Sequence, residues 1–211
     1  MIGQEFLFYD RSRKEVTVLG MNASTRFTIA LIQAYNKEGR EVLSFLTLYP
    51  YNRQAAVAYA HRWAFRRNPQ FYDYENIGGD CTNFASQCIY VGTGIMNFTP
   101  VFGWYYISPN EKSPSWTGVP YLFDFLTRTQ ASVGPVGQDT DISQIEPGDV
   151  LQMSFDGIQY KHTPVVVSVR RPITPATILI AAHSDDADNR PLSTYQYKSI
   201  RYIHIRGFYA P

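Results

Sequence analysis

The order of the periodic segments along the chain is the feature that most constrains its fold. Two segments with apolar residues at helical spacing come first, at 53–68 (RQAAVAYAHRWAFRRN) and 81–92 (CTNFASQCIYVG). Four alternating segments follow, which read VLQMSF, HTPVVVSVR, ATILIAAHS and YKSIRYIHIRGFY. Helices followed by a run of strands predict an α+β fold with the helices packed on an antiparallel sheet.

Residues 1–49 differ from the rest because they consist of short β-prone runs. Two of these runs flank NKEG, where a late glycine is typical of a hairpin loop. The motif YPYN marks a boundary, since Pro50 discourages a strand and Asn52 is a good helix N-cap. A third helix is expected near 119–129. We therefore predict an N-terminal antiparallel β extension at 1–49 and a main domain at 50–211.

Composition excludes several classes of partner. Hydrophobic residues make up 45% and charged residues 18% of the 211 residues, which is typical of a globular protein. A formal net charge of +1 gives no electrostatic case for nucleic acid or an anionic membrane. No apolar run approaches the ~18 residues of a membrane span. The start, MIGQEFLFYD, does not resemble a signal peptide, so we expect either a cytoplasmic protein or an exported one whose leader is absent from this sequence.

The two cysteines, Cys81 and Cys88, have different sequence surroundings. On one helix they would lie about 10 Å apart along the axis, which is too far for a disulfide, and their spacing fits no zinc motif. Cys88 precedes Ile89 and reads as a buried residue in mid-helix. Cys81 follows Gly-Gly-Asp and begins the helix, which favours a functional thiol.

A cysteine in the first turn of a helix meets free backbone N–H groups and the positive end of the helix dipole, which favour thiolate over thiol. Gly78 and Gly79 allow a sharp turn and leave room for a substrate beside the sulfur. Asp80 can serve as the N-cap acceptor. The motif predicts a nucleophilic Cys81.

A thiolate nucleophile needs a base and an orienting partner, and two of the four histidines suit these roles. His162 opens the HTPVVVSVR strand, and His183 closes the next strand. If RPITP links the two strands as a hairpin, these imidazoles lie near each other and can relay a proton. Asp185 has the same strand parity as His183 and could orient it. His61 and His204 read as packing or surface residues.

The chain resembles the "amidase 6" family of amidase domains, a bacterial relative of the NlpC/P60 and CHAP cell-wall peptidases. The resemblance covers about 51–205, and GGDCTNFASQC is its most specific part. Further matching segments are YNRQAAVAYAHRWAFRRNP, SWTGVPYLFDFL, IEPGDVLQ, HTPVVVSV and AAHSDD with PLSTY.

The resemblance implies a papain-like cysteine amidase or peptidase that cleaves cell-wall peptides and needs no metal or cofactor. Cys81 would be the nucleophile and His162 the general base, with His183 or Asp185 completing the catalytic set. The backbone N–H of Cys81 would supply half of an oxyanion hole, and the loop before it, at Tyr74 or Asn76, would supply the other half. Four residues are expected to bind substrate: Asp80, Asn83, Tyr74 and Trp104.

Three alternatives remain open from the sequence. An inactive descendant could bind wall peptides through the same groove, although an intact Cys81 and His162 weigh against it. An acyltransferase would pass the thioester to an amine or alcohol in place of water. A zinc hydrolase could use His162, His183 and Asp185, but no HExxH-like spacing is present.

Overall fold

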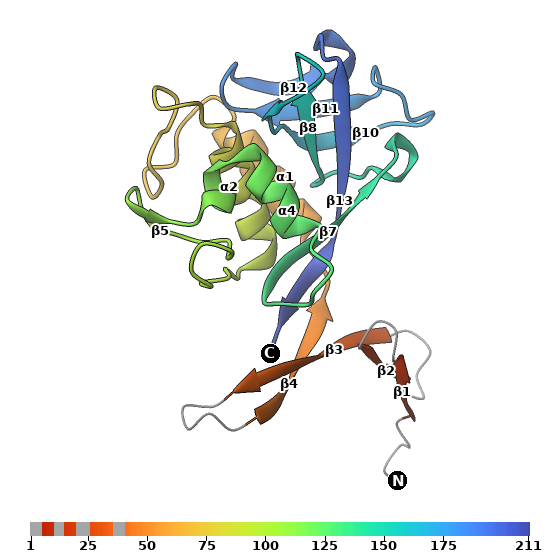
Figure 1. The fold of residues 1–211 in the computed structure, drawn as a ribbon. Helices are drawn as coiled ribbons and strands as arrows, with labels where there is room; N and C mark the ends of the chain where they lie inside the picture. The colour runs from red at the N-terminus through yellow and green to blue at the C-terminus, as the bar shows by residue number, and fades with distance from the viewer. Residues whose placement is uncertain (1–5, 11–14, 20–25, 36–40) are drawn as a thin grey trace.

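A computed structural model describes residues 6–10, 15–19, 26–35 and 41–211. In this part of the chain a large antiparallel sheet is combined with few helices, as the α+β prediction requires. Figure 1 shows α1, α2 and α4 grouped beside the strands of the C-terminal half. The helices are α1 (Arg53–Trp63), α2 (Cys81–Thr93), α3 (Pro114–Thr117) and α4 (Val119–Leu126).

Most described strands belong to one sheet in the order β1-β2-β3-β4-β13-β8-β10-β11-β12, with β7 beside β13 and β9 beside β8. A separate hairpin is formed by β5 and β6. The first strands are β1 (Phe6–Asp10), β2 (Glu15–Leu19), β3 (Arg26–Tyr35), β4 (Glu41–Tyr49), β5 (Tyr106–Ser108) and β6 (Glu111–Lys112). The later strands are β7 (Gly134–Thr140), β8 (Val150–Ser154), β9 (Tyr160–His162), β10 (Val165–Val169), β11 (Ile178–Ala182), β12 (Ala187–Pro191) and β13 (Ser199–Ala210).

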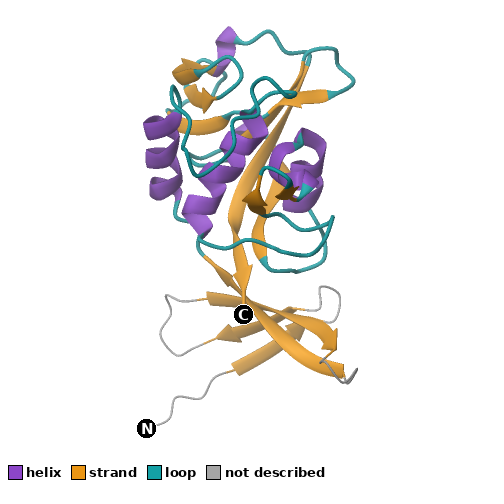
Figure 2. Cartoon of the chain, turned by 90° about the vertical axis from the view of Figure 1, so that its left-hand side faces the viewer, coloured by secondary structure: helices purple, strands orange, loops and turns teal. Residues whose placement is uncertain are grey.

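The long strand β13 joins the N-terminal strands to the rest of the sheet. One part of it pairs with β8, and its end pairs with β4, where Phe208 lies opposite Tyr49. The predicted hairpin is present as the antiparallel pair β3–β4, although its turn at 36–40 lies outside the described residues. Figure 2 shows these first strands extending away from the part that carries the helices. The division at residue 49 stays a prediction, since the sheet itself runs across it.

Helix α1 begins where the sequence predicts but ends earlier. The side chain of Asn52 accepts a hydrogen bond from the backbone N–H of Ala55 at 3.0 Å, which confirms the N-cap. The prediction that the helix continues to residue 68 is wrong, because α1 ends at Trp63. At this end the carbonyl of Trp63 contacts the imidazole of His183 at 2.9 Å, a tertiary partner that no local pattern reveals.

Helix α2 starts at Cys81 as predicted and extends slightly beyond Gly92. It ends at Thr93, and Gly94 adopts the left-handed C-cap conformation with φ of 69°. Gly92 serves packing instead, because a Cβ there would lie 2.1 Å from the Tyr51 ring. The third predicted helix is present as α4, preceded by the short α3.

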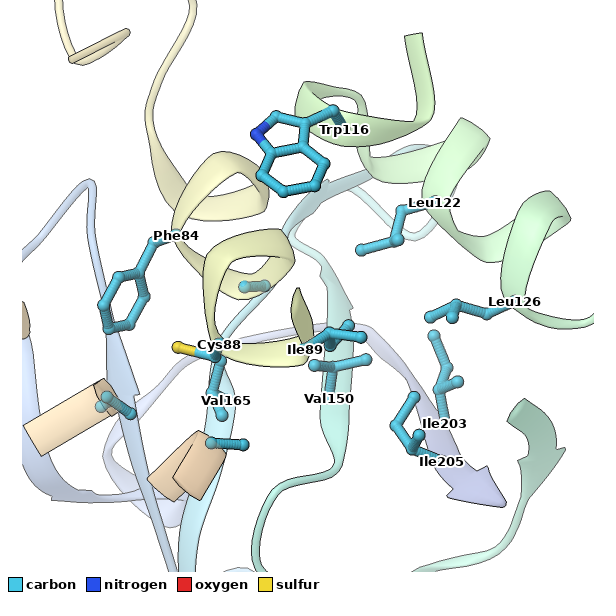
Figure 3. Packing of buried hydrophobic residues seen from close by; sticks show 14 of the residues in the cluster. Phe84, Cys88, Ile89, Trp116, Leu122, Leu126, Val150, Val165, Ile203 and Ile205 are labelled. Atoms are coloured by element: carbon cyan, nitrogen blue, oxygen red, sulfur yellow. The ribbon is translucent and has the colours of Figure 1, made fainter. Parts of the chain in front are cut away.

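The main core lies between these helices and the sheet. Phe84, Cys88 and Ile89 of α2 are fully buried and face residues of α4 and of the strands (Figure 3). Burying a large apolar side chain contributes roughly 1.5–3 kcal/mol, so this contact fixes α2 firmly. The start of α2 is thereby held at a defined position relative to the strand ends that carry the histidines.

Candidate functional site

The turn before Cys81 depends on two glycines. Gly78 and Gly79 have φ of 95° and 99°, a region that L side chains rarely adopt. A Cβ on Gly79 would lie 3.1 Å from the hydroxyl oxygen of Ser184. The same hydroxyl oxygen accepts a hydrogen bond from the backbone N–H of Asp80 at 2.7 Å. The turn therefore brings the start of α2 against the loop that follows β11.

The sulfur of Cys81 contacts the segment that contains His162. It lies 3.8 Å from the Thr82 hydroxyl and 3.9 Å from the Lys161 carbonyl oxygen, and the backbone N–H of Thr163 also donates to it. A hydrogen bond of 3.1 Å between the hydroxyls of Thr82 and Thr163 ties the helix to this segment. The nucleophile candidate is thus held beside the backbone on both sides of His162.

Burial governs the protonation of this sulfur. Cys81 is 6% exposed, and desolvation raises the pKa of its thiol, while hydrogen bonds from Thr163 and Thr82 lower it only in part. Burial therefore opposes the resting thiolate that the helix start predicts. A raised pKa favours the neutral thiol, which must lose its proton as it reacts.

His162 is the candidate for the base that accepts the thiol proton. It is the last residue of β9, is 6% exposed and packs between Phe155 and Tyr195, with ring centroids at 6.4 and 5.7 Å. Burial lowers the pKa of His162 to about 4, so the imidazole is neutral at neutral pH. Its Nε2 is buried and has no hydrogen-bond partner among the described residues. Among the described residues, the Cys81 sulfur and the His162 ring make no hydrogen bond with each other.

His183 is instead fully engaged in the interior. Its Nδ1 lies 2.5 Å from the Asp80 carboxylate and its Nε2 lies 2.9 Å from the Trp63 carbonyl. Its ring stacks on Phe84 with centroids 4.0 Å apart. Both ring nitrogens thus face an oxygen atom, and the ring pairs with the buried Asp80 carboxylate. This pair ties the end of α1 to the start of α2.

The predicted relay between two histidines is not present. His162 belongs to β9 and pairs with Met153 of β8, because Pro164 separates it from β10. The hairpin of β10 and β11 exists, with Val165 opposite Ala181, but His162 is outside it. His183 therefore has no free nitrogen with which to orient or deprotonate another group.

The four residues expected to bind substrate all lie in the interior. Asp80 is 0% exposed, and beyond its contact with His183 it accepts hydrogen bonds from the Tyr74 backbone and the Asn83 side chain. Asn83 also accepts from Trp116, and the Tyr74 hydroxyl donates to a carbonyl oxygen. Trp104 is 0% exposed and donates to Ser86. Their polar groups serve packing, so direct contact with a substrate is not what this structure shows for them.

Asp185 and two residues that the sequence reasoning missed lie close to His162. Asp185 contributes a charge that raises the pKa of His162, and it accepts a hydrogen bond of 2.5 Å from Arg190. The Arg190 guanidinium lies 3.9 Å from the centroid of the Tyr195 ring. Tyr195 belongs to the segment PLSTY, which is part of the family resemblance, but no local sequence pattern indicates that this residue lies near a histidine.

Metal binding and membrane spanning receive no support from the described residues. No group of three or more histidine, cysteine, aspartate or glutamate side chains in those ranges is arranged to hold a metal ion. None of the described helices has the length and apolar character to cross a bilayer. Both cysteines are free thiols and both are buried.

Comparison with known proteins identifies the family. The family model described as "Putative amidase domain" matches residues 50–206. The uncharacterized protein YhbB of Bacillus subtilis (strain 168) is 31% identical over 180 residues, which cover 81% of this chain and 55% of that protein. The match thus spans about half the length of the curated relative. No solved structure matches the chain. The chain belongs to this family of amidase domains.

Proposed function

We propose that this chain is a cysteine-dependent amide-bond hydrolase of papain-like arrangement, with Cys81 as nucleophile and His162 as general base. The observation that carries the proposal is the contrast in hydrogen bonding beside the sulfur. The Nε2 of His162 is buried and has no partner in the part of the chain that the structure describes, while the sulfur of Cys81 touches the backbone on both sides of that residue. A buried polar atom without a partner costs roughly 1–3 kcal/mol, which is tolerated where a ligand or a reaction uses the atom.

The mechanism starts from a neutral thiol and a neutral imidazole. As the sulfur attacks the amide carbonyl, the Nε2 of His162 accepts the thiol proton. Catalytic hydrogen bonds commonly tighten only when substrate binds, so the sulfur turns toward Nε2 at this point. Because His162 is neutral well below pH 7, its nitrogen is available as a base over the whole neutral range.

The second half of the reaction returns the proton. The negatively charged oxygen formed by the attack accepts a hydrogen bond from the backbone N–H of Cys81 at the start of α2. The helix dipole also favours negative charge at this position. His162 then protonates the leaving amine, and a water molecule hydrolyses the thioester. Asp80 and His183 take no part in these steps, but hold the helix that carries the sulfur.

We propose peptides of the bacterial cell wall as the substrate class, on the resemblance to the cell-wall peptidases. The experiment is incubation of purified peptidoglycan fragments with wild type, Cys81→Ala and the matched control Cys88→Ala, followed by mass spectrometry. We expect cleaved amides in the wild type and in Cys88→Ala, each product pair heavier than its parent by one water. Identical product profiles in the wild type and in Cys81→Ala would contradict the proposal.

The same experiment tests the alternative functions. An acyltransferase would give products heavier by an added amine or alcohol in place of water, still dependent on Cys81. A binding module would give no new products but would retain the fragments after Cys81→Ala.

A further inference from the structure

Tyr195 has the second buried polar atom beside the proposed nucleophile that lacks a well-formed hydrogen bond among the described residues. Its hydroxyl oxygen makes no hydrogen bond of good geometry within the described ranges, as is also true of Nε2 of His162, although the Arg190 guanidinium interacts with the hydroxyl oxygen as a donor. The two rings lie 5.7 Å apart, tilted by 30°. Two buried polar atoms without a well-formed hydrogen bond, on one buried ring and one half-buried neighbour, are rare in a folded protein and point to a shared ligand.

The Tyr195 ring is held by an ion pair on the surface. Arg190 lies over the ring at 3.9 Å, donates to Asp185 at 2.5 Å and donates to the Thr194 hydroxyl at 2.9 Å. These contacts fix the position of the ring, and because a guanidinium can only donate, Arg190 leaves the hydroxyl hydrogen of Tyr195 available for donation. A donor fixed in advance loses little freedom when a substrate arrives.

The hydroxyl also stays protonated under working conditions. Burial raises the pKa of Tyr195, and the charges of Asp185 and of an ionised Cys81 raise it further, against the opposing effect of Arg190. Cys81 is thus close enough for its charge to act on Tyr195. A tyrosine with a raised pKa is a hydrogen-bond donor throughout the neutral and mildly alkaline range.

Other donors near the sulfur are already in use. The backbone N–H of Tyr74, one of the two expected sources of the second oxyanion donor, donates to the Asp80 carboxylate at 2.9 Å. The hydroxyls of Thr82 and Thr163 are bonded to each other. Besides Asn76, the other candidate from the sequence, this leaves the hydroxyl hydrogen of Tyr195 as a positioned donor near the sulfur.

We propose that Tyr195 is a catalytic residue whose hydroxyl donates a hydrogen bond to the oxyanion formed when Cys81 attacks a carbonyl, which completes the oxyanion hole; this inference rests on the proposed function. In this step a bond forms between sulfur and the carbonyl carbon, and the π electron pair of the carbonyl moves to oxygen. The thiol proton goes to His162. Tyr195 keeps its own proton, and the electron pair returns to carbon when the leaving group departs.

The test uses p-nitrophenyl acetate, because acylation of a cysteine by this ester passes through an oxyanion and requires little recognition of the rest of a substrate. The variants are wild type, Tyr195→Phe, the neighbouring control Tyr197→Phe and Cys81→Ala. The measurements are the rate of the p-nitrophenolate burst and, separately, the rate at which iodoacetamide alkylates Cys81. Alkylation displaces iodide and forms no oxyanion, so it reports on the thiol alone.

We expect Tyr195→Phe to slow the burst by about 10²-fold, as for loss of one oxyanion-hole donor, and to leave the alkylation rate within about twofold of the wild type. Tyr197→Phe should leave both rates unchanged. A Tyr195→Phe burst as fast as that of the wild type would overturn the proposal, as would an equal fall in both rates, which would place the effect on the thiol. A wild type with no Cys81-dependent burst would overturn the proposed function itself, and this inference with it.

Discussion

His162 and His183 lie at the ends of neighbouring segments of the sheet, and both are almost completely buried, but their surroundings are opposite. His183 has an acceptor at each nitrogen and a stacked phenyl ring. His162 has an Nε2 without a hydrogen-bond partner among the described residues and lies beside Tyr195, whose hydroxyl makes no hydrogen bond of good geometry there. A buried imidazole nitrogen without a partner is rare in folded proteins, so the contrast supports the proposal that His183 has a structural role and His162 a chemical one.

The contrast also explains why Asp80 precedes the cysteine. Its carboxylate faces His183, the Tyr74 backbone and Asn83, and makes no side-chain capping bond to the helix. Although its carboxylate is paired in this way, the charge of Asp80 still contributes to the raised pKa of the Cys81 thiol. Asp80 therefore ties the start of α2 to the interior through three contacts.

The largest expected effect is the loss of activity on replacement of His162, which, unlike His183, is the proposed base. His162→Leu removes the proposed base and should lower kcat by roughly 10²–10⁴-fold, as loss of general acid–base catalysis does. The unfolding free energy should change by less than about 1 kcal/mol, because an apolar side chain replaces an unpaired buried nitrogen. Steady-state kinetics and urea denaturation measure both. Full activity in His162→Leu would contradict the proposed role of His162 as the base.

His183→Ala should show the reverse pattern in stability. It leaves the Asp80 carboxylate buried and unpaired, which costs about 3–5 kcal/mol. Denaturant titration should therefore show a much lower midpoint. His61→Ala, whose partner Asp188 lies near the surface, is the control and should change stability by about 0.5 kcal/mol or less. Equal midpoints for the two variants would refute the structural role of His183.

The pH dependence of stability should also distinguish wild type from His162→Leu. The pKa of His162 is lowered from 6.5 to about 4 in the folded protein, so the unfolded chain binds the extra proton first as the pH falls. The wild type should lose stability relative to the variant between about pH 6.5 and 4, by on the order of 3 kcal/mol. Denaturation curves across this range measure the difference, and parallel pH profiles would show that His162 is not buried as a neutral ring.

A smaller effect concerns the two cysteines. Because burial raises the pKa of the Cys81 thiol, its alkylation by iodoacetamide should accelerate about tenfold per pH unit from pH 7 toward 9. Cys88 is 0% exposed and its pKa is raised well above the usual value, so it should react far more slowly. Peptide mapping after timed alkylation gives both rates. A Cys81 rate that is already constant at neutral pH would indicate a thiolate–imidazolium pair instead.

Local patterns were enough to predict α2, the Asn52 cap, the β3–β4 hairpin and the strand-rich second half. These features depend on periodicity and turn chemistry within a few residues. The end of α1 at Trp63 and the pairing of Asp80 with His183 depend on contacts between distant segments, which periodicity does not encode. The position of Tyr195 was missed for the same reason, and Pro164 displaced His162 from the hairpin in which symmetry about RPITP had placed it.

The most direct test asks where an acyl group is attached. Wild type and His162→Leu are mixed briefly with p-nitrophenyl acetate, quenched in acid and digested, and fragment-ion mass spectrometry then localises the acetyl group between the two cysteines. The account predicts acetyl on Cys81 in the wild type, none on Cys88, and little on either in His162→Leu over the same time. Acetylation of Cys81 at equal rates in both proteins, or none at Cys81 in the wild type, would contradict it.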